Sequence, residues 1–136
     1  FVPVWAAIVI GAVVSPICYF TMNFLKNKLK IDDALDAFGC HGIGGIWGGI
    51  ATGLFARTDI NPVARWNGLV FGEAGLFTAQ VVSILITIAV AVVGTLVCVG
   101  ITRIFTKLRV EHKEELLGLD MTQHGERAYP SFNGLD

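Results

Sequence analysis

Residues 33–56 read DALDAFGCHGIGGIWGGIATGLFA, and this segment indicates the class of the protein. It is acidic at its beginning, free of Asp, Glu, Lys and Arg from residue 37 onward, and rich in glycine. In water, each internal glycine would destabilise a helix by up to ~1 kcal/mol. In a lipid bilayer, small residues instead allow helices to pack closely. The segment therefore predicts a tightly packed membrane helix over residues 33–55.

Two further runs of the chain are apolar and free of charged side chains, one over residues 1–25 and one over residues 74–102. A bilayer core requires about 20 apolar residues in a helix that crosses it. We therefore predict an all-α fold, a polytopic helical membrane protein with transmembrane helices over residues 2–25, 33–55 and 75–104 in the lipid bilayer. The third helix would extend about 45 Å, so we expect it to tilt or bend.

The composition excludes several classes of protein. Apolar residues make up 54% of the 136 residues and charged residues 15%, with a mean hydropathy of +0.66, whereas soluble domains carry nearer ~25% charged residues. The net charge of −1 provides no basic patch, so we expect no nucleic acid partner. The three cysteines each lie within an apolar run, which is typical of packing residues. A soluble enzyme, a nucleic-acid-binding protein and a disulfide scaffold are therefore excluded.

Lysine and arginine predict the orientation, because basic residues concentrate on the cytoplasmic side of a membrane. Three lysines follow the first run, at positions 26, 28 and 30, and three basic residues close the third, at positions 103, 107 and 109. Residues 57–74 are therefore expected outside the cell. We divide the chain into a transmembrane region, 1–109, and a cytoplasmic C-terminal tail, 110–136, of a multi-pass protein of the cell membrane. The tail is polar, so we expect it to be ordered only against a partner.

His41 is the one histidine within the three predicted spans. On an α-helix that begins at Asp33, it would share the face of Gly45 and point into the bundle, ~12 Å along the axis and near mid-depth. An ionisable side chain at that depth often lines a path for a substrate or a proton. A structural histidine bonded to a backbone carbonyl accounts for the pattern equally well. The neighbouring Cys40 points elsewhere on a helix, so we expect no metal site.

The acidic residues before His41 also allow two interpretations. Asp36, just past the first helical turn, either attracts a cation toward a pathway or caps backbone donors. Asp32 and Asp33 are expected to cap the helix.

After His41, small residues at a spacing of four predict close helix packing: Gly45, Gly49 and Gly53.

A polar stripe lies on the third predicted span, at Gln80, Ser83 and Thr87. Polar groups at membrane depth face protein or a water-filled lumen rather than lipid. We expect this stripe to form hydrogen bonds between helices, with a lumen-facing role as the alternative.

Two long motifs resemble those of a known family. Residues 36–45 follow the pattern D-x-FG-x-HG-x-GG and are followed by GLFA at 53–56, which resembles the penultimate membrane helix of ammonium transporters, in the Amt/Mep branch of the Amt/Rh family. Residues 115–129 follow the pattern E-x-x-GLD-x-x-x-HGE-x-AY, which is similar to the cytoplasmic C-terminal signature of that branch. The chain also begins inside an apolar run without a methionine. We expect it to be the last three of eleven membrane helices, with a regulatory tail.

The resemblance implies transport of ammonium or ammonia through a narrow, mostly apolar pore in each protomer of a homotrimer. His41 matches the second of two pore histidines, of which the first would lie on an earlier helix. Ala37 matches an apolar lumen position, and Asp36 matches an acidic residue with a structural or electrostatic role. We expect no enzyme activity, because the chain holds no nucleophile–base set, and we expect no metal and no cofactor.

The resemblance also implies that the tail packs under the neighbouring protomer and communicates with PII-type signal proteins. A glycine supplies a sharp turn, and an aspartate would cap a short helix over residues 121–127. Two alternatives stay open, an ammonium sensor that signals through the tail and a non-conducting membrane scaffold. The tail residues that match the family are Gly118, Asp120, His124, Gly125, Glu126 and Tyr129.

Overall fold

The computed structural model describes residues 1–126, which form helices joined by loops and turns, with no strand among them. The chain folds as two compact units, one over residues 1–91 and one from residue 92 onward. The boundary between the units lies within one long helix. The predicted all-α class is confirmed, while a functional division at residues 109 and 110 stays a prediction.

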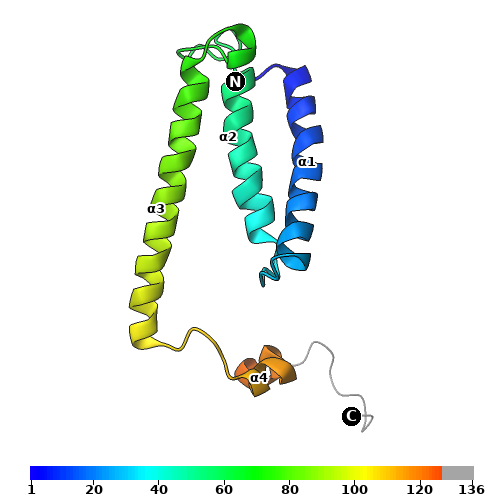
Figure 1. Ribbon diagram of the computed structural model, residues 1–136, viewed down its shortest axis with the longest axis vertical. Helices are drawn as coiled ribbons and strands as arrows, with labels where there is room; N and C mark the ends of the chain where they lie inside the picture. Colours follow the sequence, from blue (N-terminus) through cyan, green and yellow to red (C-terminus); the bar gives the residue numbers. More distant parts are fainter. Residues whose placement is uncertain (127–136) are drawn as a thin grey trace. The chain divides into compact units, whose positions relative to one another are not determined.

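Three long helical segments make up the apolar part of the chain (Figure 1). They are α1, Val4–Asn27; the π-helical turn η1, Phe38–Ile43, which continues into α2, Gly44–Phe55; and α3, Gly75–Phe105. Within the described residues, α1 and α3 are long and apolar enough to cross a membrane, by length and composition. Their bounds differ from the predicted first and third spans by two residues or fewer.

The second helix begins later than predicted, at Phe38 instead of Asp33. The segment before it cannot be helical because Asp36 has a left-handed backbone, with φ at 54°. The Asp33 carboxylate accepts hydrogen bonds from the backbone N–H groups of Ala37 and Phe38, both at 3.0 Å, and so caps the helix as expected. The helical path from Phe38 to Phe55 is therefore no longer than about 27 Å.

The first and second helices lie side by side and antiparallel (Figure 1). At one end the rings of Trp5 and Phe55 meet edge to face, with their centroids 5.6 Å apart. Further along, the indole N–H of Trp47 donates to the carbonyl oxygen of Ile10 at 3.1 Å. Nearer the other end, a methyl group at Gly44 would lie 3.6 Å from Cys18 Sγ. The glycines of the second helix thus allow it to follow α1 closely.

Glycines also bring α2 against the beginning of α3. A methyl group at Gly53 would lie 2.9 Å from the Cα atom of Phe77, closer than a real side chain allows. One turn earlier, a methyl group at Gly49 would lie 3.0 Å from Ile84 Cδ1. In contrast, Gly45 has open space around it. Two of the three predicted packing glycines therefore lie at a close helix contact, and the third lies on a free surface of this chain.

A compact loop over residues 56–74 joins α2 to α3 and includes the single turn η2, Leu69–Phe71. Its centre is Asn67, whose side-chain oxygen accepts hydrogen bonds from the Thr58 N–H at 3.0 Å and the Thr58 hydroxyl at 3.2 Å. The carboxylate of Glu73 accepts from the Asn67 backbone and side-chain nitrogens, at 2.9 and 2.7 Å. Gly68 is buried against the backbone of Leu54, where no side chain fits. These contacts hold the two helix ends together.

The first unit has very little internal core. Of residues 1–126, the buried apolar ones are three alanines, at positions 6, 51 and 56, and many large apolar side chains of α1 and α3 are exposed. Outward-facing apolar side chains suit a lipid environment or contact with further helices.

The second unit contains the end of α3 and the short helix α4, His112–Leu117. Glu111 and Glu114 form a reciprocal capping box at the start of α4. Arg109 bonds Glu115 through an ion pair of 2.8 Å. The chain then turns at Gly118, with φ at 93°, into the wide turn η3, Asp120–His124. The tail thus has local order within the described residues.

Candidate functional site

The site predicted around His41 lies where the second helix begins. His41 is within η1, four residues after Ala37, the residue that precedes this turn. The π-helical turn carries one more residue between bonded groups than an α-helical turn. His41 therefore does not keep the α-helical phase with Gly45 that the sequence suggested. Its side chain is exposed in this chain, and so is that of Ala37.

The depth of His41 follows from its pairing with α1 and not from the helix start. Gly39 packs directly against the Met22 side chain, and Gly44 lies beside Cys18. His41 is therefore level with the part of α1 between residues 18 and 22. Since α1 ends at Asn27, this level is about 7–14 Å from the end of the helix at 1.5 Å per residue. That His41 lies near mid-depth of the membrane stays a prediction. It now rests on the level of His41 along α1 and no longer on the expected start of the second helix.

A second contact ties the same turn to α1. Cys40 Sγ lies 3.8 Å from Met22 Sδ, and Gly39 is buried. The close approach requires glycine at position 39, because any larger residue would overlap Met22. Met22 is thus the neighbour that fixes the height of the turn carrying His41.

Asp36 was expected just past the first helical turn, and it lies before the helix instead. Its carboxylate pairs with the Lys26 ammonium group at 2.8 Å, across the connection from the end of α1. Its carbonyl oxygen accepts a hydrogen bond from the Cys40 N–H at 2.9 Å. The carboxylate thus pairs with Lys26, and its predicted attraction for a cation on a pathway stays a prediction.

Asp33 is a titratable group whose pKa is clearly shifted by its surroundings. Hydrogen bonds from the N–H groups of Phe38 and Ala37 stabilise its ionised form and lower the pKa of the carboxyl below its usual value. Lys26 adds a smaller attraction in the same direction. The ionised carboxylate thus helps the second helix to begin at Phe38.

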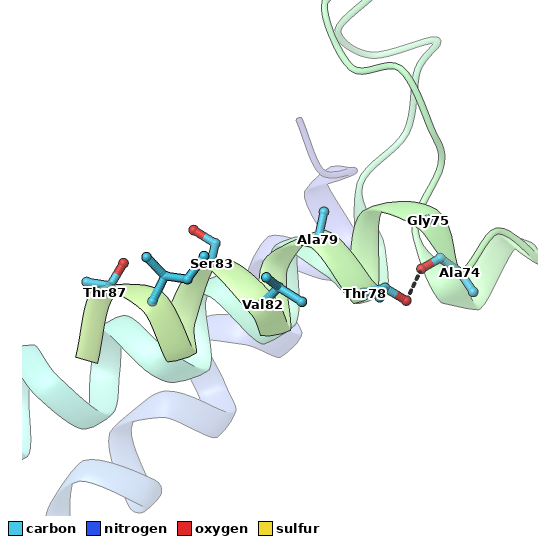
Figure 2. Close-up of a pocket in the computed structure, with 8 residues that line it drawn as sticks. Ala74, Gly75, Thr78, Ala79, Val82, Ser83 and Thr87 are labelled. Atoms are coloured by element: carbon cyan, nitrogen blue, oxygen red, sulfur yellow. Dashed lines mark hydrogen bonds between the residues drawn. The ribbon is translucent and has the colours of Figure 1, made fainter. Parts of the chain in front are cut away.

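The polar stripe predicted on α3 divides between two faces. Gln80 lies toward α2, with its Oε1 atom 3.6 Å from the methyl position of Gly49. Ser83 and Thr87 line an open groove on a different part of the α3 surface, together with Ala79 (Figure 2). The three residues therefore do not form one continuous contact in this chain.

The tail residues singled out by the motif have distinct positions. Gly118 and Gly125 both adopt left-handed φ angles, of 93° and 65°, which favour glycine. Asp120 is the first residue of η3, and the N-cap position expected for it is held by Leu119, while the Asp120 carbonyl oxygen accepts from the Glu126 N–H at 2.9 Å. His124 and Glu126 are exposed. Tyr129 lies outside the described residues.

Sequence reasoning missed three residues that build the site: Lys26, Met22 and Trp47. Lys26 was used only to predict the membrane orientation, because its pairing with Asp36 depends on the path of the segment between α1 and the second helix.

Across residues 1–126, no cluster of three or more His, Cys, Asp or Glu side chains is arranged to hold a metal ion.

Comparison with known proteins decides the family. The sequence matches the profile described as Ammonium Transporter Family over residues 1–129. The chain belongs to the ammonium transporter family. This confirms the resemblance of the two motifs, and it places the helical segments in a family of membrane transporters.

Individual relatives show the extent of the match. The chain is 48% identical to an ammonium transporter of Bacillus subtilis and 43% identical to the ammonium transporter Amt1 of Archaeoglobus fulgidus, each over 129 residues. It is 36% identical to the ammonium transporter MEP2 of Saccharomyces cerevisiae. These alignments cover 95% of the chain and 32%, 32% and 27% of the three relatives. The chain thus spans about a third of the length of the curated relatives it matches.

Proposed function

We propose that this chain is a portion of an ammonium transporter, and that the whole protein conducts ammonium or ammonia across the cell membrane. The single observation that carries the proposal is the family match over residues 1–129. The two apolar helices α1 and α3 support a membrane location. The substrate follows from relatives that are 36–48% identical and are named ammonium transporters.

Within that function, we assign His41 to the substrate pathway. Its segment has no Asp, Glu, Lys or Arg from Ala37 to Ala56, so the imidazole is one of the few polar groups of a largely apolar segment. Such an isolated polar group at membrane depth favours a role in a pathway. The exposed His41 side chain is available to groups from the rest of the protein, including a second histidine. Ala37 would line the same path, one turn away.

For the tail, we propose a cytoplasmic location and a role in coupling protomers of a homotrimer. The turns at Gly118 and Gly125 and the capped α4 give the tail local order. Exposed leucines at 116, 117 and 119 are available for contact with another surface. A PII-type signal protein is the proposed regulatory partner of this segment.

The proposal is tested by flux through the full-length protein in proteoliposomes. An imposed ammonium gradient should produce protein-dependent uptake, measured with labelled methylammonium as the probe. Binding of the probe without flux would favour the ammonium sensor. Neither binding nor flux, from a correctly assembled protein, would favour the non-conducting scaffold and contradict the proposal.

A further inference from the structure

The turn that carries His41 is held at its beginning by three charged side chains. The Lys26 ammonium group pairs with the Asp36 carboxylate at 2.8 Å. Asp33, three residues before Asp36, accepts the N–H groups of Ala37 and Phe38. The first residues of the helix are thus fixed from two directions, by a cap within the segment and by an ion pair to α1.

Asp36 links this clamp to the turn itself. Its left-handed backbone, with φ at 54°, is uncommon for a residue with a side chain and is best tolerated by Asn and Asp. The Asp36 carbonyl then accepts the Cys40 N–H at 2.9 Å, one residue before His41. A change in the backbone at Asp36 would therefore move the start of η1 directly.

The direction of the His41 side chain depends on the width of this turn. A π-helical turn inserts an extra residue into the helix, so its loss would rotate His41 about the axis relative to Gly44 and all of α2. The Gly44 end is fixed independently by Cys18 and by the Trp47 hydrogen bond to Ile10. At the other end, the Asp33 cap and the packing of Gly39 on Met22 also hold the turn. The ion pair with Lys26 is the contact that acts on the Asp36 side chain itself.

We propose that Lys26 and Asp36 are positioning residues that set the direction of the His41 imidazole by maintaining the π-helical turn. The inference rests on the proposed function, because it assigns a consequence for transport to the direction of His41. Neither side chain is placed in contact with the substrate. They act on His41 through the backbone between Asp36 and Cys40.

A stabilising surface pair would behave differently from a positioning pair. The Lys26 and Asp36 side chains are 41% and 33% exposed, so their attraction is screened and adds little to stability. The pair can bias the turn by no more than the same small free energy, so a positioning role predicts a moderate loss of transport. A moderate loss of transport together with a change in the surroundings of the His41 imidazole is therefore the signature of positioning.

The experiment uses the full-length protein in proteoliposomes with labelled methylammonium. Lys26→Gln and Asp36→Asn remove one charge each, and asparagine keeps the preference for a left-handed backbone. Each should lower the maximal rate by up to about five-fold, because an exposed ion pair can bias the turn only by its own small free energy, with an unchanged oligomer. The double variant should be no slower than the slower single variant, because both remove the same interaction. Lys26→Arg should restore at least half of the rate, and Lys28→Gln, on the same connection, should behave like the parent protein.

A spectroscopic measurement keeps the test independent of assembly defects. The imidazole nitrogen signals of His41, assigned by their loss in His41→Ala, should shift in Lys26→Gln and return in Lys26→Arg. Unchanged rates and signals in Lys26→Gln, or additive losses in the double variant, would overturn the proposal. If the parent protein transports no methylammonium, the proposed function itself fails, and the His41 signals alone then decide whether Lys26 positions the imidazole.

Discussion

The indole nitrogen of Trp47 lies 3.1 Å from the carbonyl oxygen of Ile10, a hydrogen bond between α2 and α1 in the apolar part of the chain. Trp47→Phe removes the donor and keeps most of the ring. It should lower the free energy of unfolding by about 0.5–1.5 kcal/mol, the usual contribution of one such bond. Thermal unfolding of the full-length protein in detergent measures the change. Trp66→Phe, at the half-exposed Trp66, is the control, and equal effects of both variants would contradict a specific role for Trp47.

Gly53 lies at a close contact between α2 and α3. Gly53→Ala places a methyl group 2.9 Å from the Cα atom of Phe77, and the backbone has to move apart to accept it. We expect destabilisation of about 1–3 kcal/mol, as for other overpacked sites. The same substitution at Gly45, which has open space in this chain, should cost less. Thermal unfolding of the two variants tests this, and a Gly53→Ala protein as stable as its parent would show that the helices are not in contact there.

Asn67 connects Thr58 with Glu73 across the loop that joins α2 to α3. Asn67→Ala leaves the Thr58 N–H and part of the Glu73 carboxylate without their partners. Half-buried polar groups left unpaired cost about 1–3 kcal/mol, so the loop over residues 56–74 should open more readily. Faster cleavage of this loop by an added protease is the expected result. Asn61→Ala, which removes one exposed bond to Val63, should be cleaved at nearly the parental rate, and equal cleavage of all three proteins would contradict the account.

The lowered pKa of Asp33 predicts that its stabilisation of the start of the second helix is lost in acid. Its folded pKa is lowered, chiefly by the hydrogen bonds from Phe38 and Ala37, so its contribution is complete above the unfolded value near 3.9. As the pH falls below that value and through the lowered folded pKa, the contribution is lost. Asp33→Asn should therefore be less stable than its parent at neutral pH and should approach it in acid. The free energy of unfolding of the parent and of Asp33→Asn is measured from pH 6 downward over about 4 pH units. A difference between the two proteins that stays constant over this range would rule out this role.

The sequence predicts much of this fold because its strongest signals are long and local. Charge-free runs locate α1 and α3 within two residues, and the acidic residue Asp33 marks the cap of the second helix. The phase of His41 could not be predicted, because the π-helical turn depends on the left-handed Asp36 and on Gly39 meeting Met22. These contacts bring together residues about ten to seventeen positions apart, and no period in the sequence encodes them. The pairing of Lys26 with Asp36 was missed for the same reason.

The central claim is that His41 lies in the ammonium pathway, and one measurement tests it most directly. Methylammonium uptake is compared in proteoliposomes that contain full-length parent protein, His41→Ala or His112→Ala. His112 begins the exposed helix α4, so its variant controls for loss of a histidine outside the spans. We predict that His41→Ala abolishes uptake or changes its substrate preference while the oligomer survives, and that His112→Ala transports like the parent. Parental uptake and preference by a correctly assembled His41→Ala protein would contradict the claim.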